Sequence, residues 1–184
     1  MRYIAFLRAI NVGGHNVTMA ELRKLFGGMG FRNVETFIAS GNVIFEAPNA
    51  DPVALEKKIE KNLEKKLGYE VGTFVRTERE IAAIAQHMPF TPEAIARATA
   101  LHVAFTDTDL DAAHRRKVRE FNDDVSDFDT HGREVYWCCS VRTSDSKFPS
   151  TKFEKLMGIR ATWRNMNTVR RLADKYPVKE EKTK

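Results

Sequence analysis

Hydrophobic and polar positions along the chain predict short strands that alternate with amphipathic helices. Residues 2–9 are almost continuously apolar, which is typical of a strand covered on both faces. Glycines follow, and a helix is predicted next because Thr18 and Glu21 have the spacing of a capping box. An apolar stripe continues this helix until glycines within residues 27–30 end it.

Two β-rich runs, 33–39 and 42–47, are expected to form a hairpin that turns at Ser40 and Gly41. The remaining elements predicted for the first half are a helix over 52–67, a strand over 71–76 and a helix from residue 77. This half therefore has the order βαββαβ with one appended helix.

The same order recurs after residue 92, although the two halves share little sequence identity. The predicted elements are strand 101–105, helix 109–122, strands 125–129 and 134–140, a helix from Ser150 to residue 157, strand 160–164 and helix 167–176. We therefore expect an α+β fold of two ferredoxin-like βαββαβ units, each with an appended helix. The expected divisions are an N-terminal half over 1–90, a C-terminal half over 91–178 and a disordered tail over 179–184.

Composition limits the classes of protein to which this chain can belong. The chain carries 30 Lys and Arg against 25 Asp and Glu, a net charge of +5, which favours anionic over cationic ligands. No apolar run approaches the roughly 20 residues of a membrane-spanning helix, and no cofactor motif is present. The only cysteines, Cys138 and Cys139, point to opposite faces of one predicted strand, so we expect reduced thiols and a cytoplasmic protein. We expect no membrane partner, and the sequence does not specify an oligomeric state.

The first candidate binding residues follow the first strand: Arg8, Asn11, Gly13, Gly14 and Asn16. Glycines expose backbone N–H groups, and the helix start that follows adds partial positive charge, so a phosphate or carboxylate suits this turn. Arg8 would add a bidentate contact to such an anion. The structural alternative is that the glycines only turn the chain.

Ser40 and Asn42 form the second candidate group. In a ferredoxin-like sheet, the first and third strands are antiparallel neighbours, which brings the end of one beside the start of the other. We therefore expect Arg8 and Asn42 to share one rim of the sheet.

The third group is Arg164, Asn165 and Asn167, at a predicted strand-to-helix junction beside Trp163. Basic, carboxamide and aromatic side chains in this mixture suit a phosphate, with ring stacking as an option. Two alternatives remain open: Asn167 or Thr168 caps the last helix, or the cluster is a solvated basic face around a buried tryptophan.

Four segments resemble the bacterial domain-of-unknown-function family 1697. They are YIAFLRAINVGG at residues 3–14, the MAEL helix start at 19–22, ASGNVIF at 39–45, and ATWRNMNTV at 161–169. The resemblance covers residues 1–176 and implies a cytoplasmic bacterial protein with two ferredoxin-like halves. It implies no activity. Ala9 stands where the family usually has Gly, and Met166 where it usually has Trp.

We hypothesise a non-catalytic binding protein for a phosphate-bearing anionic ligand, a nucleotide or nucleic acid, at a cleft between the two halves. The alternative is a small-molecule enzyme that uses the same cleft, with His15 as acid or base. No metal site is expected, because no histidine pairs with a second His or Cys at ligand spacing.

Overall fold

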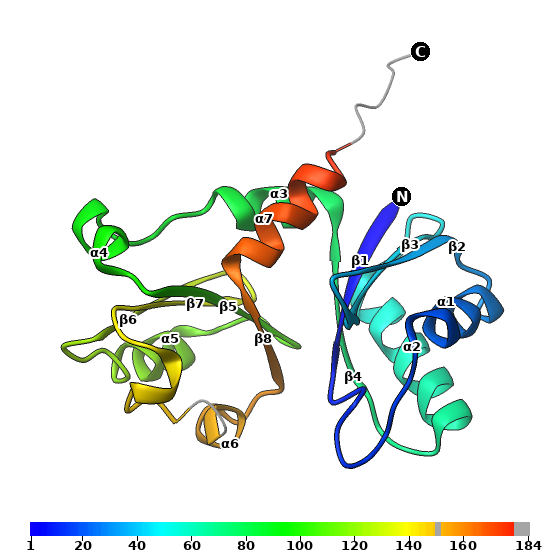
Figure 1. Ribbon diagram of the computed structural model, residues 1–184, viewed down its shortest axis with the longest axis horizontal. Coiled ribbons are helices and arrows are strands. Elements are labelled where there is room, and N and C mark those ends of the chain that lie inside the picture. The colour runs from blue at the N-terminus through cyan, green and yellow to red at the C-terminus, as the bar shows by residue number, and fades with distance from the viewer. Residues whose placement is uncertain (150–151, 179–184) are drawn as a thin grey trace. The chain divides into compact units, whose positions relative to one another are not determined.

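The computed structural model describes residues 1–149 and 152–178, without the side chains of Ala39 and Ser40. It contains two four-stranded antiparallel sheets with helices (Figure 1), which confirms the α+β class and the repeated βαββαβ order. Two compact units result: Met1–Gln86 together with the chain from Val169, and His87–Thr168. The tail predicted over 179–184 lies outside the described residues.

The first unit contains β1 (Arg2–Arg8), α1 (Met19–Gly28), β2 (Arg32–Phe37), β3 (Ala39–Glu46), α2 (Pro52–Leu67), β4 (Gly72–Thr77) and α3 (Glu78–Gln86). Its sheet has the order β2-β3-β1-β4, and all neighbouring strands are antiparallel. Helices α1 and α2 cover one face of this sheet (Figure 1). Their apolar stripes, including Leu22 and Phe26 on α1 and Ile59 and Leu63 on α2, are fully buried against strand residues such as Phe45.

The hairpin turns earlier than the sequence predicts. Phe37 pairs with Ala39, so the turn is at Ile38, and Ser40 and Gly41 belong to β3. A register shift between Thr36 and Phe37 in the β2–β3 pairing moves the turn away from the local Ser-Gly signal. As a result, the β-branched residue Ile38 is exposed and has a φ of 62°.

The second unit contains α4 (Pro92–Arg97), β5 (Ala100–Thr106), α5 (Ala112–Arg119), β6 (Ser126–His131), β7 (Glu134–Cys139), the 3₁₀ turn Thr143–Asp145, α6 (Phe153–Met157) and β8 (Ala161–Asn165). Its sheet order is β6-β7-β5-β8. Helix α7 (Met166–Lys175) begins here and belongs to the first unit from Val169. Helix α4, capped by Thr91, begins just after the expected boundary between the halves and was not predicted from the sequence. The predicted cap Ser150 lies outside the described residues.

Carboxylates cap the outward N–H groups of edge strand β4. The N–H of Thr73 donates to Glu60 at 2.9 Å, and that of Val75 donates to Glu56 at 2.8 Å. Both glutamates lie on one face of α2, four residues apart. The second unit repeats the device, since the N–H of Ala161 on β8 donates to Glu154 of α6 at 2.7 Å. Helix α2 therefore turns two of its acidic side chains toward the sheet edge, away from its solvent-facing lysines.

Candidate ligand-binding site

The loop between β1 and α1 is closed by Asn11. Its Oδ1 accepts the N–H of Val17 at 2.7 Å, and its Nδ2 donates to the carbonyl of the same residue at 3.5 Å. Ile10 and Val17 are buried at the two ends of the loop, with exposures of 5% and 7%. The side chain of Asn11, a predicted ligand residue, therefore stabilises the conformation of the loop.

Gly13 and Gly14 form the turn at the tip of this loop. Their φ angles are 69° and 87°, and the N–H of His15 donates to the carbonyl of Val12 at 3.4 Å. Two successive positive φ angles favour glycine at both positions. The turn presents the exposed side chains of His15 and Asn16 to the helices that follow.

His15 stacks on Tyr69. The two ring centroids are 3.8 Å apart with an interplanar angle of 17°. Tyr69 follows Gly68, the left-handed residue that ends α2, and its hydroxyl donates to the carbonyl of Ile10 at 2.8 Å. Burial raises the pKa of the Tyr69 phenol, so it stays a neutral hydrogen-bond donor around pH 7.

A cavity of about 710 Å³ opens beside this ring pair, and we call it the α1–α2 cavity. Lysines and carboxamides gather on it from three segments of the first unit. The lining residues are His15, Asn16, Val17, Glu21, Lys24, Leu25, Gly28, Met29, Asn62, Lys66, Leu67 and Tyr69. The lining thus contains two ammonium groups, one carboxylate and several apolar side chains.

That single carboxylate, Glu21, is held at the start of α1. It accepts the N–H and the hydroxyl of Thr18, both at 2.8 Å, while the Thr18 hydroxyl accepts the N–H of Glu21 at 3.2 Å. These hydrogen bonds from Thr18 lower the pKa of Glu21 below its ordinary value. The expected anion position at the start of this helix is therefore already occupied by the chain's own carboxylate.

Arg8 does not line the cavity. It is exposed at the end of β1, opposite Gly72 of β4, where a Cβ added to the glycine would lie 3.5 Å from the Arg8 Cβ. The arginine stem therefore lies beside Gly72. Of the predicted residues after β1, only Asn16 lines the cavity, together with His15 of the alternative hypothesis.

Asn42 lies at the expected rim but faces inward. It pairs with Phe6 near the end of β1, and its exposure is 3%. Its Nδ2 donates to the carbonyl of Phe37 at 3.1 Å, across the hairpin. Asn42 therefore stabilises the displaced turn. Ser40 lies in β3, and its side chain is outside the described part of the chain.

Arg164, Asn165 and Asn167 lie in the second unit. The Arg164 guanidinium donates to the Thr162 hydroxyl at 2.9 Å and to the Trp163 carbonyl at 2.8 Å, and burial lowers its pKa to about 10. The Oδ1 of Asn165 accepts the N–H of Asn167 at 2.9 Å and caps α7. Asn165 thus has the capping role that the sequence assigned to Asn167 or Thr168.

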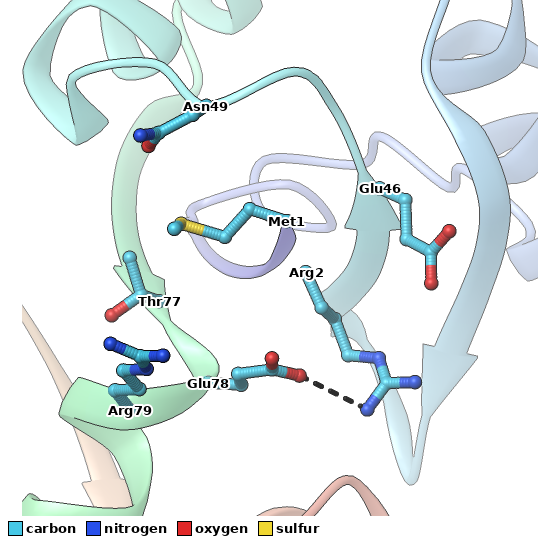
Figure 2. A pocket seen from close by; sticks show the side chains of 7 residues that line it. All are labelled: Met1, Arg2, Glu46, Asn49, Thr77, Glu78 and Arg79. Atoms are coloured by element: carbon cyan, nitrogen blue, oxygen red, sulfur yellow. Dashed lines mark hydrogen bonds and ion pairs between the residues drawn. The ribbon is translucent and has the colours of Figure 1, made fainter. Parts of the chain in front are cut away.

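A second cavity, of about 450 Å³, lies at the opposite end of β1. Figure 2 shows Arg2 paired with Glu78 at its edge, with a distance of 3.2 Å between Nη1 and Oε2. The other residues in this view are Met1, Glu46, Asn49, Thr77 and Arg79. Its lining combines two guanidinium groups and the N-terminal residue with two carboxylates, and the Met1 ammonium donates to the Ala47 carbonyl at 2.9 Å.

Two histidines of the second unit stack, although the sequence gives no sign of it. The rings of His87 and His131 are 4.6 Å apart, with Tyr136 at 4.8 Å from His87. Burial and then His131 lower the pKa of His87, against the opposing effect of Asp129. Within residues 1–149 and 152–178, no three His, Cys, Asp or Glu side chains form a group suited to a metal ion.

Sequence reasoning missed Lys24, Asn62, Lys66 and Tyr69. Asn62 and Lys66 are four residues apart on α2, so helical spacing alone places them on one face. That signal is present in the sequence, but nothing local says that this face meets α1. The contribution of Tyr69 depends on how α2 ends beside the loop after β1.

The fold and this cavity belong to a protein of an uncharacterised family. Residues 1–136 match the family described as Protein of unknown function (DUF1697), and the chain belongs to it. Among solved structures, the chain is similar to the conserved bacterial protein SP0830 from Streptococcus pneumoniae, with a TM-score of 0.72 and 24% identity over 95% of this chain and 97% of that chain. A comparison with curated proteins finds no match. No helix within residues 1–149 and 152–178 is long and apolar enough to cross a membrane.

Proposed function

We propose that this protein binds a phosphate-bearing anion, a nucleotide or nucleic acid, without catalysing a reaction on it, and that the α1–α2 cavity receives the phosphate. The observation that carries this proposal is the charge balance of the cavity. Lys24 and Lys66 line it from two helices, while Glu21, the one lining carboxylate, is engaged by Thr18.

The arrangement of α2 reinforces this balance. Its residues Glu56 and Glu60 are bonded to the backbone of β4 and do not line the cavity. Lys66 near the end of the same helix therefore has no acidic neighbour from α2 on the cavity lining. Lysine ammonium groups bind phosphate as mobile point charges, which suits a solvent-exposed site.

Carboxamides complete the donor set. Asn16 comes from the loop after β1 and Asn62 from α2, so both flank the lysines on the lining. The Nδ2 of Asn62 donates to the Lys58 carbonyl at 2.8 Å, which fixes the orientation of its amide plane. A preoriented amide loses little side-chain entropy when it contacts a ligand.

The arginines of the sequence hypothesis, Arg8 and Arg164, remain proposed contributors, with one in each unit. Replacing either arginine by alanine should lower the affinity for a polyanion that it contacts and reduce the salt dependence of binding. Both cysteines are buried free thiols, which fits the reducing cytoplasm in which we propose that the protein works.

The test is titration calorimetry with ribose 5-phosphate, comparing two charge-reversed variants. Lys24→Glu combined with Lys66→Glu should lower the affinity at least tenfold, because two attractions become repulsions. Lys57→Glu combined with Lys61→Glu is the matched control, since both lysines are exposed on α2 and neither lines the cavity. Equal loss in both variants, or no binding by the wild type, contradicts the proposal.

The rival function is an enzyme that uses His15 to carry a proton. It is favoured by one observation: an exposed imidazole lines the same cavity as the two lysines. A screen of phosphate esters tests it, with any turnover compared between wild type and His15→Ala. Turnover that survives the substitution removes the acid–base role.

A further inference from the structure

The His15–Tyr69 pair has the geometry of a stacking platform. With centroids 3.8 Å apart and planes inclined by 17°, the phenol covers one face of the imidazole. His15 is nevertheless exposed and lines the α1–α2 cavity, so its ring is accessible to a ligand there. A flat ring entering the cavity would extend the stack to three rings.

This platform is held from both sides. The Tyr69 hydroxyl is fixed to the Ile10 carbonyl at 2.8 Å, and the backbone of His15 closes the glycine turn onto Val12 at 3.4 Å. Asn11 further ties the loop across its base to Val17. A ring already held in place costs little ordering entropy when a ligand stacks on it.

The lining of the cavity includes both apolar and polar side chains. Val17, Leu25, Met29 and Leu67 supply apolar lining, while the lysines and carboxamides supply donors. A sugar phosphate would use only the polar part. A volume of about 710 Å³ falls in the range of small-molecule sites, so a ligand with both a flat ring and a phosphate can be accommodated.

We propose that the α1–α2 cavity takes a mononucleotide whose base stacks on His15, which makes His15 a specificity-determining residue for the base. The proposal rests on the proposed function, because the phosphate is held by Lys24 and Lys66. Stacking of a base on a protein ring commonly contributes about 5- to 150-fold in affinity.

The experiment compares adenosine 5′-monophosphate with ribose 5-phosphate by titration calorimetry. The wild type should bind the nucleotide at least fivefold more tightly. His15→Leu should abolish that preference and leave the affinity for ribose 5-phosphate unchanged, whereas His15→Phe should retain it. Val12→Ala is the loop control, because Val12 is 63% exposed and does not line the cavity.

This experiment distinguishes a failure of the stacking proposal from a failure of the proposed function. Equal affinity for the two ligands in the wild type overturns the stacking proposal and leaves the phosphate site intact. Absence of binding by either ligand overturns the proposed function and the stacking proposal together. A single-stranded oligonucleotide that binds more tightly than the mononucleotide, through His15, contradicts a mononucleotide site.

Discussion

The hydroxyl of Tyr176 donates a 2.7 Å hydrogen bond to Oε2 of Glu35, a residue 141 positions earlier in the chain. The ammonium of Lys175 reaches the same oxygen at 3.4 Å, and the ring of Tyr176 lies edge-on to Phe37, with centroids 6.4 Å apart. The end of the last helix is thereby fastened to β2 and its turn. This explains why the chain from Val169 belongs to the first unit.

Removing either partner of this hydrogen bond should weaken the fold modestly. Glu35→Ala and Tyr176→Phe should each lower the free energy of unfolding by about 0.5–1 kcal/mol, because the carboxylate is half-exposed and screened by solvent. Urea unfolding of both single variants and the double variant measures this. The double variant should lose less than the sum, and strict additivity would show that the two groups do not interact.

The same contact predicts a pH dependence. The hydrogen bond from Tyr176 holds the pKa of Glu35 below its ordinary value of 4.5. A carboxyl with a lowered folded-state pKa adds stability above its unfolded value and loses it as the pH falls through the folded value. The difference in stability between wild type and Glu35→Ala should therefore shrink as the pH falls below about 4.5. A difference that stays constant into acid contradicts the assignment.

Removing a carboxylate that caps the edge of β4 should lower the free energy of unfolding. Glu56 is 3% exposed, accepts the N–H of Val75, and lies 3.7 Å from the guanidinium of Arg76. Glu56→Ala should lower the free energy of unfolding by about 2–4 kcal/mol, because a buried donor and a buried cation lose their carboxylate. Glu64→Ala, at an exposed site on the same helix, should change it by less than about 0.5 kcal/mol. Equal effects from both substitutions would mean that the edge caps contribute nothing.

Ala9 is held in the left-handed region, with a φ of 62°. Because glycine adopts this conformation without steric penalty, Ala9→Gly should raise the free energy of unfolding by up to about 1 kcal/mol. Ala20→Gly is the matched control, since this residue is helical and exposed, and it should lose about 0.5–1 kcal/mol. Thermal unfolding shows whether each substitution raises or lowers the free energy of unfolding. A destabilised Ala9→Gly variant would show that the backbone at Ala9 is not strained.

Elements with strong local signals could be predicted from the sequence. Thr18 and Glu21 form the expected capping box, and Asp51 caps α2 as Pro52 begins it. The hairpin turn could not be placed, because a register shift between Thr36 and Phe37, which no local motif signals, moves it to Ile38. Helix α4 was missed because six residues between prolines and a strand carry little periodic signal.

The candidate site was only half accessible to sequence reasoning. Local motifs drew attention to the loop after β1, and its residues His15 and Asn16 line the cavity. Its cations come from Lys24 and Lys66, which are brought together only by the packing of α1 beside α2. Polar residues at turns also serve as internal caps, as Asn11 and Asn165 do here, and a sequence does not separate that role from ligand binding.

The most direct test of an anion site in the α1–α2 cavity is a titration of the ¹⁵N-labelled protein with ribose 5-phosphate, followed by amide chemical shifts. The shifts should concentrate at residues 15–29 and 62–69 and disappear in the Lys24→Glu, Lys66→Glu variant. Shifts confined to other parts of the chain, or an unchanged titration in that variant, would contradict the site.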